Sequence, residues 1–106
     1  MTNREYILDK VPVWELLAQV AEEASELTQA ALKVRRTFGI SNPTPLSLEE
    51  TLEQFEEEIA DLLLCLEMLG YDLDTLRRYR GQMDDKLQRW ATRLGKTQEV
   101  DTNGKD

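Results

Sequence analysis

Histidine is absent from this sequence, and cysteine occurs once, at Cys65. Without histidine, the chain lacks the commonest general base near neutral pH and a favoured zinc ligand. One cysteine cannot form a disulfide within the chain, so we expect a reducing, cytoplasmic environment. Any metal site must therefore be built from oxygen ligands, which favours magnesium, manganese or calcium.

The chain also lacks a long hydrophobic run. Its most apolar stretch, residues 59–69, contains Asp61 and Glu67, and it is too short and too charged to span a bilayer. The first residues do not show the charged and then apolar pattern that directs secretion. We therefore expect a cytoplasmic protein without a membrane partner.

Positive charge is scarce, because 13 lysines and arginines stand against 21 aspartates and glutamates and leave a net charge of −8. Nucleic-acid polymers are bound through basic surfaces, so this balance argues against such a partner. If the chain binds phosphate, a cation must mediate the contact. The hydrophobic share of 41% and the charged share of 32% fit a folded, helix-rich protein rather than a disordered one.

Helical periodicity predicts an all-α fold. The first main helix is expected over residues 12–38, where one face carries Leu16, Val20, Glu23, Leu27, Ala30 and Val34. The second is expected to start at a capping box formed by Ser47 and Glu50. It should end near Leu69, with an inward face of Leu52, Phe55, Ile59, Leu62, Leu66 and Leu69.

A third main helix is expected from near Asp72 or Asp74 to about Leu94. Residues 96–106 are polar and aperiodic, so we expect a disordered tail after a single domain over residues 1–95. A domain this small buries only about two-thirds of its unfolded surface, which leaves its own core marginal. We therefore expect a bundle of three main helices per chain that is completed by oligomerisation.

Two carboxylate pairs occur at the same spacing on consecutive helices. Glu23 and Glu26 form a Glu-x-x-Glu pair in the first, and Glu58 and Asp61 form a Glu-x-x-Asp pair in the second. Side chains three residues apart lie about 60° apart around a helix, so each pair points to a common place. Two such pairs facing each other would make a cage of four carboxylates.

Acidic pairs also occur on solvated helix faces, and that interpretation must be weighed in an acidic chain. The positions of these acids favour a metal site, because Glu23 interrupts an otherwise apolar helix face and Asp61 lies among leucines. A buried carboxylate needs a partner, and the second helix has no basic residue to neutralise its own acids. A bound cation is the simplest partner. Di-iron bundles use Glu-x-x-His pairs, so the lack of histidine disfavours that class.

Two motifs follow each other along the chain: Glu22-Glu23-x-x-Glu26-Leu27 and, after a loop, Glu57-Glu58-x-x-Asp61-Leu62-Leu63. This order resembles the MazG-like branch of the all-α NTP pyrophosphatases. The resemblance implies a homodimer or homotetramer that hydrolyses a nucleoside triphosphate to the monophosphate and pyrophosphate, as in nucleotide-pool cleaning. The cofactor that it implies is Mg²⁺, with Mn²⁺ as an alternative. The matching metal ligands are Glu23, Glu26, Glu58 and Asp61.

One carboxylate is expected to accept a proton from the attacking water, and the candidates are Glu26, Glu22 and Glu57. A solvated helix surface is an equally good interpretation for Glu22 and Glu57. The sequence does not choose among the three.

Lys86, Arg89 and Arg93 share one face of the third helix, where the resemblance implies phosphate contacts. Many relatives carry a lysine followed four residues later by an asparagine, whereas this chain has Gln82 and then Lys86. A plain basic surface stripe is the alternative, above all for Arg93. Trp14 is a candidate for stacking on the nucleobase, with a core or interface position as its alternative.

Two other functions stay open. Phosphoribosyl-ATP pyrophosphohydrolase shares the chemistry and the acidic helices, although the loop and the third helix look more MazG-like. A non-catalytic helical interaction module, with its acids on a solvated face, predicts no magnesium-dependent release of pyrophosphate.

Overall fold

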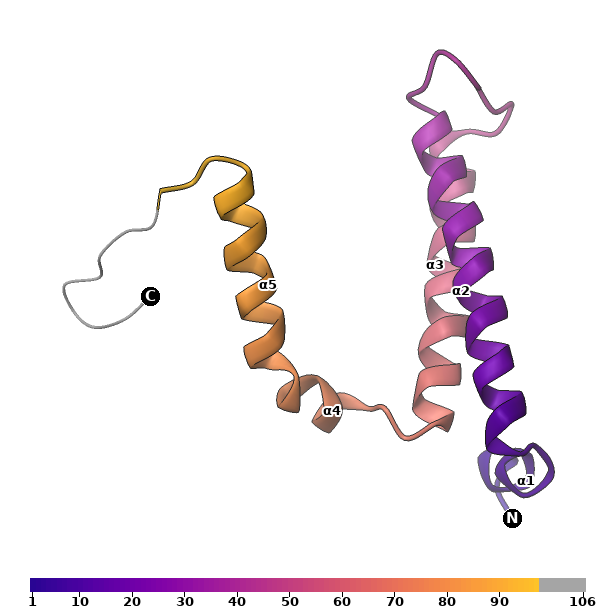
Figure 1. Cartoon of the computed structure of the whole chain (residues 1–106). Coiled ribbons are helices and arrows are strands. Elements are labelled where there is room, and N and C mark those ends of the chain that lie inside the picture. Colours follow the sequence, from indigo (N-terminus) through magenta and orange to yellow (C-terminus); the bar gives the residue numbers. More distant parts are fainter. Residues whose placement is uncertain (98–106) are drawn as a thin grey trace. The chain divides into compact units, whose positions relative to one another are not determined.

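A computed structural model describes residues 1–97 of the chain, and this part of it is all-helical, as expected (Figure 1). Its helices are α1 (Asn3–Lys10), α2 (Val13–Arg36), α3 (Leu48–Met68), α4 (Leu73–Arg78) and α5 (Arg80–Arg93). The first three belong to one compact unit, Met1–Asp72, and the last two to a second unit that begins at Leu73. The disordered tail predicted over residues 96–106 lies outside the described residues from residue 98 onward.

Helix α1 was not expected from the sequence. It starts at a capping box in which the Glu5 N–H donates to Thr2 Oγ1 at 3.0 Å and the Thr2 N–H donates to Glu5 Oε2 at 3.1 Å. It ends at Val11, whose extended backbone is the conformation that a residue before proline prefers. Its apolar residues are consecutive rather than spaced at helical intervals, so periodicity does not reveal it.

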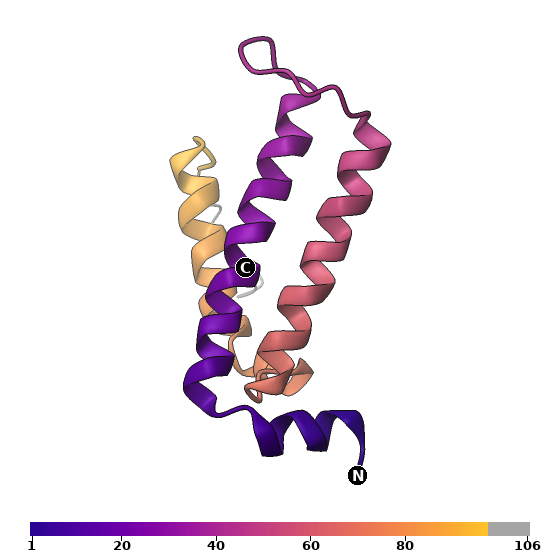
Figure 2. The same cartoon turned by 90° about the vertical axis from the view of Figure 1, so that its right-hand side faces the viewer.

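Helices α2 and α3 run antiparallel and side by side, and α1 crosses one end of the pair (Figure 2). The predicted start of α3 is confirmed, since the Glu50 N–H donates to Ser47 Oγ and the Ser47 N–H donates to Glu50 Oε1. Gly70 ends it with a φ of +98°, a left-handed conformation that residues with a Cβ rarely adopt. The predicted first helix, residues 12–38, is α2, with Pro12 as its N-cap.

The interface between α2 and α3 is thin. Leu16 and Ala30 on α2 are its buried apolar residues, and the predicted inward face of α3 is half-buried except for Leu52, which is 40% exposed. Large apolar side chains elsewhere on the two helices stay exposed, among them Trp14, Leu17, Leu63 and Leu64. Within the described residues, this pair of helices therefore presents apolar surface that the first unit does not cover.

The third predicted helix is interrupted, which corrects the expectation of one helix from near Asp72 to Leu94. Tyr79 separates α4 from α5 with a ψ near 1°, far from the helical value. Gly81 lies two residues after this break, and glycine is a poor helix former because it loses the most backbone entropy.

None of the helices in the described part of the chain has both the length and the apolar character needed to cross a membrane.

Candidate metal centre

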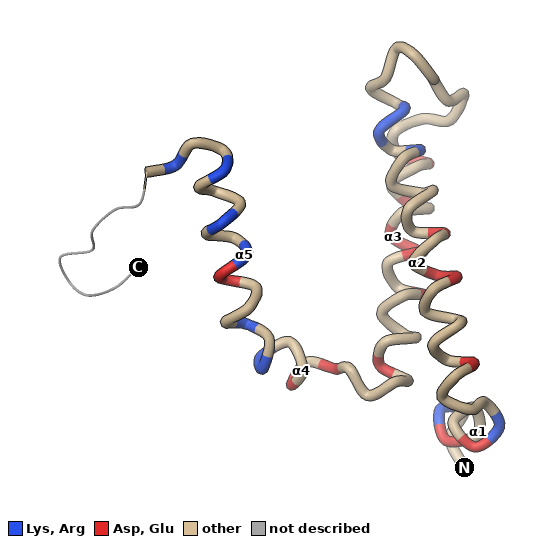
Figure 3. Tube along the Cα trace, in the orientation of Figure 1, with Lys and Arg blue, Asp and Glu red and all other residues tan. Residues whose placement is uncertain are grey.

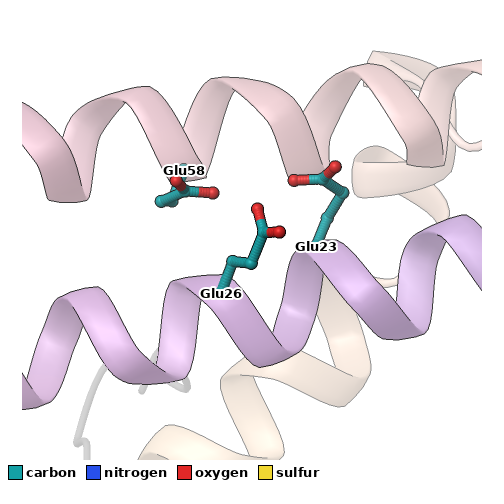
Figure 4. A group of neighbouring side chains, drawn as sticks. All are labelled: Glu23, Glu26 and Glu58. Atoms are coloured by element: carbon teal, nitrogen blue, oxygen red, sulfur yellow. The ribbon is translucent and has the colours of Figure 1, made fainter.

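Three of the four predicted metal ligands come together between α2 and α3. Glu23 and Glu26 extend from α2, and Glu58 extends toward them from α3 (Figure 4). One carboxylate oxygen from each residue lies within 4.8 Å of the other two. The i, i+3 spacing places the two α2 side chains on one face, and the antiparallel packing of the helices adds the third.

Two oxygens in this cluster are buried without a hydrogen-bond donor. They are Glu23 Oε2 and Glu58 Oε2, while the Glu26 side chain is exposed to solvent. A buried polar atom without a partner is destabilising, and more so when it carries charge. Glu23 and Glu58 therefore have unmet bonding capacity in the space between the helices.

Crowding of negative charge affects the protonation of Glu26. The charge of Glu23 is the largest cause that raises the pKa of Glu26 above its ordinary value of 4.5. Desolvation and the charges of Glu58 and Glu22 act in the same direction. Each cause disfavours an ionised Glu26, so a cation near these groups would favour ionisation.

Asp61, the fourth predicted ligand, does not join this group. It is exposed, one turn along α3 from Glu58. Burial is the largest cause that raises the pKa of the nearby Cys65 thiol, and the charges of Glu23 and then Asp61 act in the same direction. The charges of Asp61 and Glu23 thus both act on Cys65, but Asp61 offers no oxygen at the distance of the other three ligands.

Gln19 belongs to the candidate centre, and sequence reasoning missed it. Its side-chain amide donates a hydrogen bond of 3.0 Å to Glu23 Oε1. The spacing of Gln19 and Glu23, one helical turn, is a recognisable signal for such a pair. The signal is weak by itself because amide and carboxylate residues occur at this spacing on many exposed helices.

The proton-acceptor candidates beside the cluster are exposed. Glu22 and Glu57 each precede a ligand residue and are exposed to solvent, although the charge of Glu22 raises the pKa of Glu26.

Trp14, the candidate for stacking on the base, is 70% exposed near the start of α2. The structure therefore places Trp14 at the surface of the first unit rather than in its core.

The predicted phosphate contacts belong to the second unit. Lys86, Arg89 and Arg93 are exposed on α5, and together with Gln88 and Thr92 they line an open hollow on its surface. Figure 3 shows acidic residues along α2 and α3 and several basic ones along α5. Acidic residues thus outnumber basic ones in the first unit, whereas basic residues outnumber acidic ones on α5.

The donor set fits a hard divalent cation. All three converging side chains are carboxylates, and Mg²⁺ and Mn²⁺ prefer such oxygens together with water and phosphate oxygens. The two buried oxygens without a donor are suited to direct coordination.

No family model, curated protein or solved structure matches this chain.

Proposed function

We propose that this protein is a magnesium-dependent nucleoside triphosphate pyrophosphohydrolase of the MazG-like type. The observation that carries the proposal is the convergence of Glu23, Glu26 and Glu58, since these residues belong to two separate sequence motifs. Their two buried oxygens without a donor add support, because a solvated acidic face would leave such atoms in water. Mn²⁺ is the alternative cofactor.

Glu23, Glu26 and Glu58 would hold the cation, and Asp61 would join them after a change of side-chain rotamer. The bound ion would supply charge neutralisation for the triphosphate and a water of lowered pKa. In the proposed reaction, the water oxygen bonds to the α-phosphorus and the bond from that phosphorus to the bridging oxygen breaks. Pyrophosphate leaves, and the nucleoside monophosphate remains.

A carboxylate must accept the proton that the attacking water loses. Glu26 is the first candidate, because its side chain belongs to the cluster and is open to solvent. Glu22 and Glu57 are the other candidates.

The remaining parts of the proposal concern the substrate and the assembly. Lys86, Arg89 and Arg93 would contact phosphate oxygens, since they line one hollow and carry the positive charge that a triphosphate needs. Trp14 would stack on the base. A second copy of the chain, in a homodimer or homotetramer, would cover the apolar surface of α2 and α3. Nucleotide-pool cleaning in the cytoplasm is the role that we propose.

The test is release of pyrophosphate from a panel of canonical, deoxy and damaged nucleoside triphosphates, with and without magnesium. Formation of monophosphate and pyrophosphate only in the presence of the metal is the expected result. Turnover restricted to phosphoribosyl-ATP would identify the histidine-biosynthesis enzyme instead. If no nucleotide and no phosphoribosyl-ATP is hydrolysed, the chain is a helical interaction module and the proposal is wrong.

A further inference from the structure

The two oxygens of the Glu23 carboxylate have different surroundings. Oε1 accepts the hydrogen bond of 3.0 Å from the Gln19 amide. Oε2 is buried and has no donor. The amide thus satisfies one oxygen and leaves the other available to a ligand in the interior.

A glutamine suits this arrangement because its amide donates a hydrogen bond and carries no charge. A lysine or arginine at this position would neutralise the carboxylate and repel a cation. The hydrogen bond also restricts rotation of the Glu23 side chain, which reduces the entropy that the side chain must lose when it binds an ion. The hydrogen bond therefore orients the carboxylate without placing a positive charge beside it.

We infer that Gln19 is a positioning residue, which holds Glu23 so that Oε2 coordinates the divalent cation. This inference rests on the metal site proposed above. Hydrogen-bond partners that orient metal ligands typically account for a 10- to 100-fold difference in metal affinity. By contrast, an exposed side-chain pair one turn apart contributes little to helix stability, so the effect on the fold should be small.

The chain contains a matched control. Gln54 lies one turn before Glu58 on α3, as Gln19 lies one turn before Glu23 on α2, and both glutamines are exposed. Among residues 1–97, however, no hydrogen bond joins Gln54 to Glu58, whose Oε2 is the other buried oxygen. A substitution at Gln54 therefore removes the same amide at the same spacing from a ligand without removing such a hydrogen bond.

The experiment titrates the full chain with Mn²⁺ and follows the free ion by electron paramagnetic resonance, for the parent, Gln19→Met and Gln54→Met. We expect Gln19→Met to weaken Mn²⁺ binding by about 10- to 100-fold and Gln54→Met to stay within about twofold of the parent. Melting temperatures in chelator should be the same for all three proteins. Gln19→Ala, a substitution to the best helix former, repeats the measurement in case methionine disturbs the fold.

Two results would overturn the inference while leaving the proposed function intact. One is an unchanged Mn²⁺ affinity in Gln19→Met, and the other is an equal loss in both glutamine variants. A parent protein that binds no Mn²⁺ at millimolar concentration would instead remove the metal site itself, and the role of Gln19 with it. The three proteins together therefore distinguish failure of the inference from failure of the proposed function.

Discussion

Glu23 on α2 and Glu58 on α3 each bury a carboxylate oxygen that has no hydrogen-bond donor, and the two side chains offer oxygens within 4.8 Å of each other. Two like charges at this separation repel, and the burial of one oxygen of each reduces the solvent that screens the repulsion. The metal-free cluster is therefore destabilised by its own charge. A cation that binds there would relieve the repulsion and stabilise the fold.

Glu58→Gln tests this relationship directly. We expect the variant to melt at the same temperature as the parent or higher in chelator, because one of the repelling charges is gone. In the parent, magnesium should add roughly 2.7 kcal/mol of stability at a hundredfold excess over its dissociation constant, and the variant should lose most of that gain. Glu56→Gln, an exposed neighbour on the same helix, is the control that should behave like the parent. An equal magnesium response in all three proteins would contradict the site.

Asp61→Asn tests whether the fourth motif residue joins the reaction. We expect hydrolysis to be abolished while the metal-free protein stays as stable as the parent or becomes more stable, because Asp61 is exposed and adds one more negative charge to an acidic pair of helices. The variant and the parent are compared by activity assays and thermal melts, each with and without magnesium. A variant that hydrolyses nucleotides normally would remove Asp61 from the proposed site. Destabilisation of equal size with and without magnesium would instead indicate a structural role.

The raised pKa of Glu26 predicts a specific pH dependence in chelator. The folded protein holds this proton more tightly than the unfolded chain, so the contribution of Glu26 to stability should fall as pH rises from 4.5 through the raised pKa. Glu26→Gln carries no titrating group there and should lack this contribution. Melts of both proteins across acidic and neutral pH check the difference between them. A difference that does not change with pH would show that the cluster does not perturb Glu26.

Lys86→Ala and Arg89→Ala should weaken substrate binding more than they affect folding, because both side chains are exposed on α5 and would contact phosphate. We expect KM to rise by about tenfold or more for each variant, as loss of a charge-assisted hydrogen bond worth about 1.5–3 kcal/mol implies. Melting temperatures should not change. Lys96→Ala, an exposed lysine outside the hollow, is the control. Kinetic constants equal to those of the parent in both variants would reject these phosphate contacts.

The exposed apolar surface of α2 and α3 predicts at least a dimer. Leu63 and Leu64 are more than half exposed in the first unit, whose core contains few buried apolar residues. Light scattering at micromolar concentration should give at least twice the mass of the chain. Leu63→Glu should shift the protein toward monomer, because a charge on the buried face of an interface is costly. A parent protein that is monomeric under these conditions would refute the prediction.

The sequence by itself determined where α2 and α3 begin and end and which of their faces turn inward. A capping box at Ser47 and a glycine after α3 act through local hydrogen bonds and backbone freedom, so they can be recognised without a tertiary fold. Helical spacing fixed the pairing of Glu23 with Glu26 for the same reason. Helix α1 starts at a capping box of the same kind, but it was not predicted because its apolar residues lack helical spacing. The only sequence signal of the break at Tyr79 is a nearby glycine.

The tertiary structure alone decided which carboxylates meet. Glu58 reaches Glu23 and Glu26 while Asp61 stays outside, because the relative rotation and register of α2 and α3 set the distances between side chains on different helices. The hydrogen bond from Gln19 to Glu23, by contrast, lies within α2, where the one-turn spacing alone makes it possible. Spacing along one helix specifies an angle around that helix, and only packing specifies what lies across from it.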